Sequence, residues 1–220
     1  DGTAWPEGPC IIVRVAPDGD DTNDGSSWAV AKRTVQAGID AAAEAGGEVW
    51  VKAGTYAERI TLRTFVHVYG GFAGTETDLS DRDPTNNLTI IDGQGARRCV
   101  YAGVSMTGVL LNGFVIANGS APSGPGGGLF AESGAPQIRN CTFQGNSGGC
   151  GGGVCGSGYG SDLAECVIIG NTASDYGGGV FSYAGSTRLA SCTLSNNTAR
   201  EGGGAWISDS IAQISGGTFD

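Results

Sequence analysis

The residues best suited to chemistry form an acidic segment near the N-terminus. Within seven positions the chain has four aspartates and one asparagine, namely Asp18, Asp20, Asp21, Asn23 and Asp24. Calcium binds oxygen ligands of this kind, so the segment is a candidate calcium loop, and calcium is the only cofactor that the sequence suggests. It does not fit an EF-hand, because a threonine stands at the third ligand position and no glutamate closes the loop. The alternative is a turn whose aspartates and asparagine bond nearby backbone.

The rest of the chain offers few groups that could catalyse a reaction. Glycoside hydrolysis needs two carboxyl groups about 5–10 Å apart. Asp175 and Glu201 are the best candidates, since their separation (201 − 175 = 26) would place them on adjacent repeats. The alternative is that both are solvated turn residues. The single histidine, His67, alternates with valines and is expected to point outward. We therefore predict no catalytic residue.

Seven cysteines, an odd number, favour packing over a disulfide framework. Cys141, Cys166 and Cys192 recur in steps of 25 and 26, and we expect them to stack as buried thiols. Their Cα atoms would also lie within disulfide range if the repeats are adjacent strands. Cys150 and Cys155 flank a glycine corner and could pair locally. A zinc site is disfavoured, because the chain has one histidine and no Cys-x-x-Cys.

Aromatic residues could form a face for stacking on sugars. The chain has four tryptophans and six tyrosines: Trp5, Trp28, Trp50, Trp206, Tyr56, Tyr69, Tyr101, Tyr159, Tyr176 and Tyr183. They share no single position in the repeat described below. We therefore expect most of them to be core and cap residues.

Composition and charge exclude several classes of protein. The formal net charge is −10 and the only lysines are Lys32 and Lys52, so no basic patch can bind nucleic acid or an anionic membrane. The chain contains no run of 18 apolar residues that could span a membrane. The chain starts at Asp1 and stops part-way through a repeat. We expect it to be a trimmed segment of a longer protein.

A repeat of about 25 residues organises residues 126–220. Glycine triplets begin at Gly126, Gly151, Gly177 and Gly202, in steps of 25, 26 and 25. The cysteines at 141, 166 and 192 and the asparagines at 146, 171 and 197 keep the same register. A fixed period in this range is typical of a stacked architecture.

Each repeat reads as strand, turn, strand, turn, with no helical window. Such a unit cannot enclose a core alone, so each strand must pair with its counterpart one coil later. The predicted fold is all-β, a right-handed parallel β-helix. The asparagines, with Asn118 as the first rung, are predicted to form a structural ladder: Asn118, Asn146, Asn171 and Asn197. The larger step (146 − 118 = 28) is attributed to an insertion at 120–125.

The N-terminal segment is predicted to close the solenoid. Thr34 is a favourable N-cap, and apolar residues recur at helical spacing from Val35 to Ala45, before Gly46-Gly47. We expect residues 1–47, a strand and this amphipathic helix, to cap a single domain of 1–220. Coils would fill 48–220, with a polar excursion at 72–88 outside them.

Two resemblances accompany these patterns. Gly127-Gly128-Leu129 with Phe143-Gln144-Gly145-Asn146 resembles the repeat of chlamydial polymorphic membrane proteins, and a looser copy is Gly178-Gly179-Val180 with Leu194-Ser195-Asn196-Asn197. That resemblance covers the second half of the chain and implies a right-handed β-helix at a bacterial surface, with no catalytic residue. The first half is similar to the start of pectate-lyase-like β-helix proteins, in which a helix plugs the open end. The similarity lies in the order of its elements: a strand, an Asp/Gly loop, a helix and then the residues Glu-Val-Trp-Val.

The hydrolase motifs of pectate-lyase-like proteins are absent from the coils, and the only Asp-Asp pair precedes them. We expect a non-catalytic extracellular or bacterial cell-surface module, structural or adhesive, in a longer protein or assembly. The expected partners are copies of itself or a carbohydrate or cell-surface component. The alternative is a polysaccharide-binding or polysaccharide-degrading protein.

Overall fold

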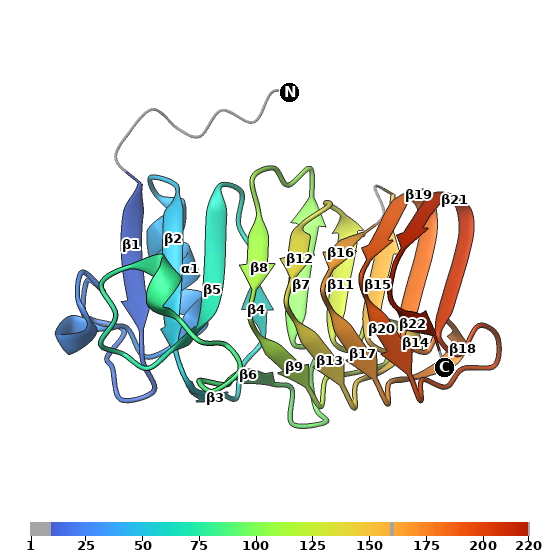
Figure 1. The fold of residues 1–220 in the computed structure, drawn as a ribbon, viewed down its shortest axis with the longest axis horizontal. Coiled ribbons are helices and arrows are strands. Elements are labelled where there is room, and N and C mark those ends of the chain that lie inside the picture. Colours follow the sequence, from blue (N-terminus) through green and yellow to red (C-terminus); the bar gives the residue numbers. More distant parts are fainter. Residues whose placement is uncertain (1–9, 159–160, 220) are drawn as a thin grey trace.

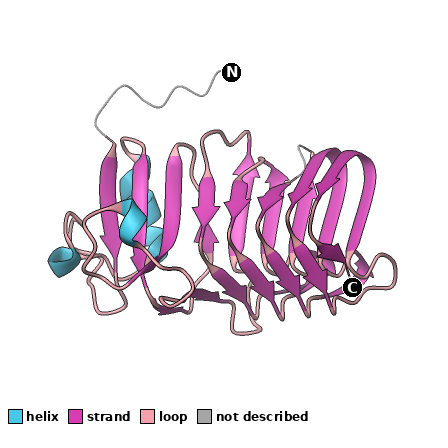
Figure 2. Cartoon of the chain, in the orientation of Figure 1, coloured by secondary structure: helices cyan, strands magenta, loops and turns pink. Residues whose placement is uncertain are grey.

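The computed structural model describes residues 10–158 and 161–219. The predictions for residues 1–9, Trp5, Tyr159 and Asp220 lie outside the described residues. The described chain winds as a parallel β-solenoid whose coils follow one another along the long axis (Figure 1). The all-β prediction is confirmed, since strands and turns make up nearly all of it (Figure 2).

The coils build three sheets in which all the strand pairs are parallel. The first has twelve strands: β1 (Ile11–Val15), β2 (Gly47–Lys52), β4 (Ile60–Thr61), β5 (Val66–Phe72), β7 (Val100–Val104), β8 (Leu110–Asn112), β11 (Leu129–Ser133), β12 (Gln137–Arg139), β15 (Val154–Ser157), β16 (Asp162–Ala164), β19 (Val180–Ala190) and β21 (Ala205–Ser215). The second has seven: β3 (Gly54–Tyr56), β6 (Thr89–Asp92), β9 (Val115–Ala117), β13 (Thr142–Gln144), β17 (Val167–Ile169), β20 (Thr193–Ser195) and β22 (Thr218–Phe219). The third has three: β10 (Ser120–Pro125), β14 (Ser147–Cys150) and β18 (Thr172–Tyr176).

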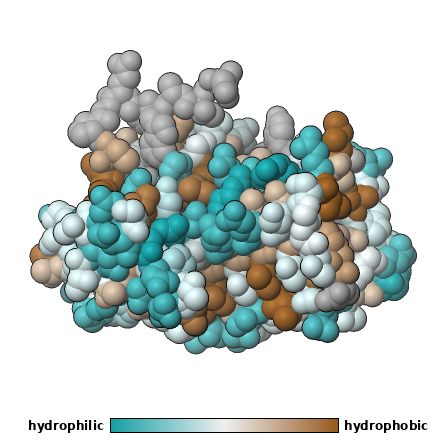
Figure 3. Space-filling model, viewed as in Figure 1, coloured by the Kyte–Doolittle hydropathy of each residue, from teal (hydrophilic) through white to brown (hydrophobic). Residues whose placement is uncertain are grey.

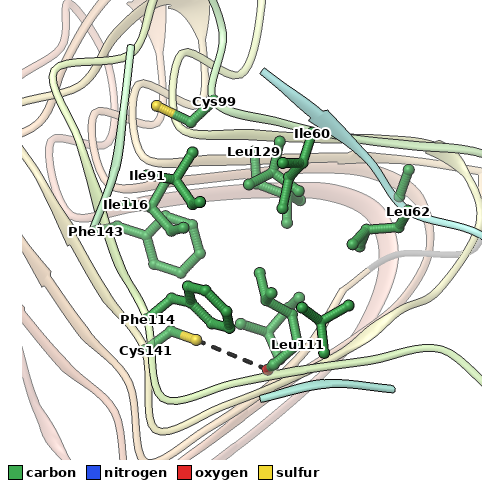
Figure 4. Packing of buried hydrophobic residues seen from close by; sticks show 14 of the residues in the cluster. Ile60, Leu62, Ile91, Cys99, Leu111, Phe114, Ile116, Leu129, Cys141 and Phe143 are labelled. Carbon is green, nitrogen blue, oxygen red and sulfur yellow. Dashed lines mark hydrogen bonds between the residues drawn. The ribbon is translucent and has the colours of Figure 1, made fainter. Parts of the chain in front are cut away.

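The solenoid interior is a continuous apolar core. Side chains from several sheets point inward in Figure 4, among them Ile60, Leu62, Leu111, Phe114, Ile116, Leu129 and Phe143. Each of these is at most 2% exposed. Because the inward positions alternate along every strand, each coil adds one apolar layer to those of its neighbours.

The glycine triplets form tight corners between the third sheet and the first. Gly126 and Gly177, the first residues of two triplets, both have φ of 61°, in the left-handed region that favours glycine. At Gly127 a Cβ atom would lie 2.1 Å from the carbonyl oxygen of Ser147 in the next coil. A side chain there would force the coils apart, which explains the recurrence of glycine.

Helix α1 (Val35–Ala43) lies against the first strands, ending two residues earlier than predicted. The Thr34 side chain accepts a hydrogen bond from the amide of Ala37, as an N-cap does. Val35, Ile39 and Ala42 are fully buried in the core. The helix thus supplies apolar side chains where no earlier coil exists to do so.

The long connection between β5 and β6 folds back over the outer face of β2 and β5 (Figure 1). It contains the short 3-10 helix η2 (Leu79–Asp81), and a second such helix, η1 (Trp28–Val30), lies nearby. Leu79 packs on Trp50, Tyr69 and Phe72, and the indole of Trp28 donates to the carbonyl of Glu76. The excursion is therefore held against the coils by an aromatic cluster of its own.

Candidate functional site

The carboxylates of the acidic segment accept hydrogen bonds from neighbouring backbone. Asp20 accepts from the amide and hydroxyl of Thr22, and Asp24 accepts from the amide of Ser26. Asp21 accepts from the amides of residues 33 and 34 at 2.9 and 2.8 Å. These donors lower the pKa of the carboxyl groups of Asp20 and Asp24.

A lysine provides the positive charge inside this loop. The ammonium of Lys32 donates to the carbonyls of Asp21 and Asn23 at 3.1 and 2.6 Å, and Asp18 pairs with Lys52 at 3.5 Å. Among the described residues, no three histidine, cysteine or acidic side chains are grouped so that they could hold a metal ion. Calcium binding stays a prediction, for which this arrangement provides no ligand set.

The same segment protects the edge of the first sheet. The amides of Arg14 and Ala16 in and after β1 donate to the carbonyls of Gly25 and Lys32, and the amide of Lys32 donates to the carbonyl of Arg14. An unpaired strand edge would invite pairing with another chain. The loop therefore has a structural use that requires no metal.

Three of the predicted asparagines form a chain of amide hydrogen bonds. The side-chain nitrogen of Asn146 donates to the side-chain oxygen of Asn171 at 2.9 Å, and Asn171 donates in the same way to Asn197 at 3.0 Å. Each side-chain oxygen also accepts the backbone amide of the preceding rung. Each side-chain nitrogen donates further to a carbonyl of the preceding coil, as from Asn171 to Phe143. Asn146 and Asn171 therefore link their coils to both neighbours, and Asn197 links its coil to the preceding one.

Asn118 is not a rung of this ladder, which corrects the sequence prediction. Strand β9 pairs with β13 so that Ala117 faces Gln144, which makes Gly119, one residue further on, the counterpart of Asn146. The amide of Gly119 indeed donates to the Asn146 side chain at 2.7 Å. Asn118 instead lies at an exposed corner with φ of 52° and donates to Asp92. Asparagine tolerates this left-handed conformation, and glycine takes it in the next two coils, at 145 and 170.

The cysteine column is buried and reduced. All seven cysteines, each within the described residues, are free thiols. Cys141, Cys166 and Cys192 are each 1% exposed, and their thiols donate to nearby backbone carbonyls such as those of Arg139 and Ala164. Burial raises the pKa of Cys141 to about 11. Cys141 is thus a poor nucleophile, and all three buried residues serve as small apolar side chains.

Asp175 and Glu201 lie on adjacent coils as predicted, since the amide of Glu201 donates to the carbonyl of Asp175 at 3.0 Å, but their side chains have separate partners. A parallel bridge pairs Glu201 with Tyr176 and not with Asp175. Glu201 forms an ion pair with Arg200, while Asp175 accepts from the hydroxyl of Ser174. His67 lies on the outer face at half burial, 3.3 Å from the hydroxyl of Tyr69, and burial lowers its pKa. None of these arrangements provides two facing carboxyl groups.

Sequence reasoning missed a column of aromatic side chains on the outer face of the first sheet. Strand register places Tyr101 beside Phe130, Phe130 beside Cys155, Cys155 beside Phe181, and Phe181 beside Trp206. The expectation that the aromatics share no position is therefore wrong for Tyr101 and Trp206. Phe130, Cys155, Phe181 and Trp206 each stand two residues after a glycine triplet, which is the signal that could have found them.

A groove of about 400 Å³ follows this column at its centre. It is lined on one side by the first sheet, through Phe130, Cys155, Ser157, Phe181 and Tyr183. The other side comes from the third sheet, through residues 122–125, Gly149, Cys150, Ser174 and Asp175. Apolar rings and a few convergent polar groups are typical of ligand sites. We regard this groove as the candidate functional site.

Comparison with known proteins supports the fold. Residues 79–219 match a family model described as a right handed beta helix region. No curated protein and no solved structure gives a significant match. The match does not extend to the chlamydial repeat type or to pectate lyases in particular. Because it covers more than half of the chain and agrees with the parallel coils, the chain belongs to the right-handed β-helix family.

Proposed function

We propose that this chain is a non-catalytic extracellular or bacterial cell-surface module, in which a stiff β-helix carries an adhesive surface. The proposal rests on the structural roles of the residues at the repeated positions. The asparagines at 146, 171 and 197 bond coil to coil, the glycines allow close corners, and the cysteines fill the core. None of these positions presents a reactive group to solvent.

The surface is compatible with an exposed location. Figure 3 shows a face that is mostly hydrophilic, with hydrophobic residues scattered over it. In the described part of the chain no helix is long and apolar enough to cross a membrane. The cysteines at 141, 166 and 192 would be protected from oxidation by their burial.

Self-assembly is the first partner that we propose. Within the described residues, β21 pairs on one side only, with β19. Ile211, Ile214 and Phe219 in these last strands are 70, 51 and 45% exposed. An open edge flanked by apolar side chains could pair with a second copy or with further coils. Light scattering over a range of concentrations should show association, and Ile211→Lys should reduce it.

Polysaccharide binding is the second candidate, and the aromatic groove is the observation that favours it. Degradation of the polymer is disfavoured, because the described carboxylates form no facing pair. The test is incubation with acidic and neutral polysaccharides while unsaturated products and reducing ends are followed. We expect no product from any of them. Turnover of any substrate would overturn the non-catalytic proposal.

A further inference from the structure

We propose that Cys150 and Cys155 form a disulfide bond across the glycine corner in the groove when the protein meets a small external disulfide. In the structure both residues are free thiols, and both line the groove. Such a bond would be a covalent modification of the groove, which the proposed function does not include. Three observations point to it: the convergence of side chains at this corner, the unequal exposure of the two thiols, and the open space beside one of them.

Side chains from the two strands that meet at this corner converge toward the groove. Strand pairing places Cys150 beside Tyr176 and Cys155 beside Phe181 in the next coil. Tyr176 and Phe181 are in contact across the equivalent corner, with ring centroids 6.4 Å apart. The two cysteines occupy the same pair of positions one coil earlier, so their side chains face each other in the same way.

The preceding coil shows the same convergence. There the two positions are held by Pro125, beside Cys150, and Phe130, beside Cys155. A single side chain spans both of them: the guanidinium of Arg98 lies 5.0 Å from the centre of the Phe130 ring and donates to the carbonyl of Pro125 at 2.6 Å. The corner is therefore closed enough in three successive coils for its two sides to be bridged.

The backbone approaches closely at the cysteine coil. A Cβ atom placed on Gly151, the residue after Cys150, would lie 2.8 Å from the Cβ atom of Cys155. The three glycines between the cysteine strands allow the small adjustment that a disulfide requires. Burial, followed by the neighbouring Cys150, raises the pKa of Cys155 to about 12, which agrees with two adjacent sulfur atoms.

The two thiols differ in their access to solvent. Cys155 is 1% exposed, whereas Cys150 is partly exposed. The groove of about 400 Å³ in front of Cys150 leaves room for a small external thiol group. An external disulfide therefore reacts at Cys150, and Cys155 can react only with a sulfur atom that is already held in the groove.

The reaction is a thiol–disulfide exchange in two steps, with oxidised glutathione as the oxidant. The thiolate of Cys150 attacks one sulfur of oxidised glutathione, forms a mixed disulfide and releases one glutathione thiolate. The thiol of Cys155 then loses its proton, and its sulfur attacks the Cys150 sulfur and releases the second glutathione thiolate. Overall the two cysteines lose two protons and two electrons, and oxidised glutathione becomes two molecules of reduced glutathione.

Burial of Cys155 should make the bond slow to reduce. A reductant reaches only the sulfur of Cys150, so Cys155 must be the leaving group, and a thiol with a raised pKa leaves slowly. The bond would join β14 of the third sheet to β15 of the first sheet. The two walls of the groove would then be held together covalently at this coil.

The experiment treats the reduced full chain with oxidised glutathione, quenches it with acid, alkylates it in denaturant and analyses chymotryptic peptides by mass spectrometry. Cleavage after Phe143 and Tyr159 releases a peptide whose only cysteines are Cys150 and Cys155. We expect this peptide to be lighter by two hydrogen atoms and to carry no alkyl group. The thiols of the cysteine column should be fully alkylated. Because the oxidant is added, the result does not depend on the proposed extracellular location.

Two variants test the roles of the thiols. Cys155→Ser removes the second thiol and should trap glutathione on Cys150 as a stable mixed disulfide. Cys155→Ala serves the same purpose if the serine variant does not fold. Cys150→Ser should leave Cys155 unmodified, because that thiol is buried. The matched control is Cys10→Ser, which removes an exposed thiol outside the groove and should leave bond formation unchanged.

Any of three results for the wild-type chain would overturn the proposal. In the first, Cys150 and Cys155 are both alkylated although Cys10 has taken up glutathione. In the second, Cys150 retains glutathione and Cys155 stays a thiol. In the third, the thiols of the cysteine column are oxidised before those of the groove.

Discussion

Asn171 is the middle rung of the asparagine ladder and is fully buried. Its side chain accepts from the amide and the side chain of Asn146 and donates to Phe143 and Asn197. Replacement by alanine leaves several of these partners unpaired, each at a cost of about 1–3 kcal/mol. We predict that Asn171→Ala lowers the thermal unfolding midpoint clearly more than Asn197→Ala, whose side chain is less buried and makes one bond fewer.

Asn118→Gly provides the control for that comparison. Residue 118 lies at an exposed left-handed corner where other coils have glycine, so the change should alter the unfolding free energy by only about 0.5 kcal/mol or less. If Asn171→Ala is as silent as Asn118→Gly, the buried ladder does not stabilise the coils. If Asn171→Ala instead abolishes sugar binding with the midpoint unchanged, the ladder is a recognition surface.

Glu76 ties the excursion together, because its carboxylate accepts from the amides of Ala73, Gly74 and Thr75. Burial opposes ionisation, but these donors outweigh it and the pKa of Glu76 is lowered. A lowered pKa means that the charged form stabilises the fold above the unfolded-state pKa, and that this is lost as the pH falls through the folded-state pKa. We predict that Glu76→Gln costs roughly 1–2 kcal/mol at neutral pH and progressively less in acid. Urea unfolding at several pH values checks this, and a difference that does not vary with pH would contradict it.

Helix α1 depends on a carboxylate from the coil that it covers. Glu58, between β3 and β4, accepts from the amides of Val35 and Gln36, which have no partner within the helix. Thr34 serves the amide of Ala37, so three amides of the first turn are satisfied by side chains. The end of the solenoid is thus joined to its plug by hydrogen bonds as well as by apolar contact.

We predict that Glu58→Ala destabilises the fold by about 1–3 kcal/mol, because two partly buried amides lose their acceptor. Circular dichroism and urea unfolding measure this. Glu44→Ala, at the C-cap of the same helix, is the matched control and should have little effect. Equal effects of the two changes would mean that the Glu58 contact does not stabilise the cap.

The local stability of the coils should differ along the axis of the molecule. Each coil contacts only its neighbours, so an inner coil gains two interfaces and an end coil gains one. The first end is covered by α1 and by the acidic loop, whereas β21 pairs on one side only in the described chain. We predict that the amides of β21 and β22 exchange with solvent faster than those of β12 and β13. Hydrogen exchange followed by mass spectrometry checks this, and uniform protection would mean that the coils unfold as one unit.

Much of this fold could be predicted from local patterns. The 25-residue period, the inward cysteines, the rungs at Asn146, Asn171 and Asn197, and a helix starting at Val35 all depend on contacts that repeat at a constant spacing or lie within one element. Such features are encoded where they occur, since period and alternation fix which side chains face inward. The candidate groove could be predicted only in part from such local patterns.

The remainder was decided by strand register across loops of unequal length. The insertion before the first glycine triplet conceals that Gly119, and not Asn118, corresponds to Asn146. Tyr101 precedes every triplet, so only its pairing with Phe130 shows that it belongs to the aromatic column. The groove also needs a second wall from β10, β14 and β18, which meets the first sheet at the glycine corners. Sequence determined the coil, because coil contacts recur at a fixed period. Tertiary structure decided the groove, because its walls come from different sheets and coils. The loops of unequal length between them determine which residues lie side by side.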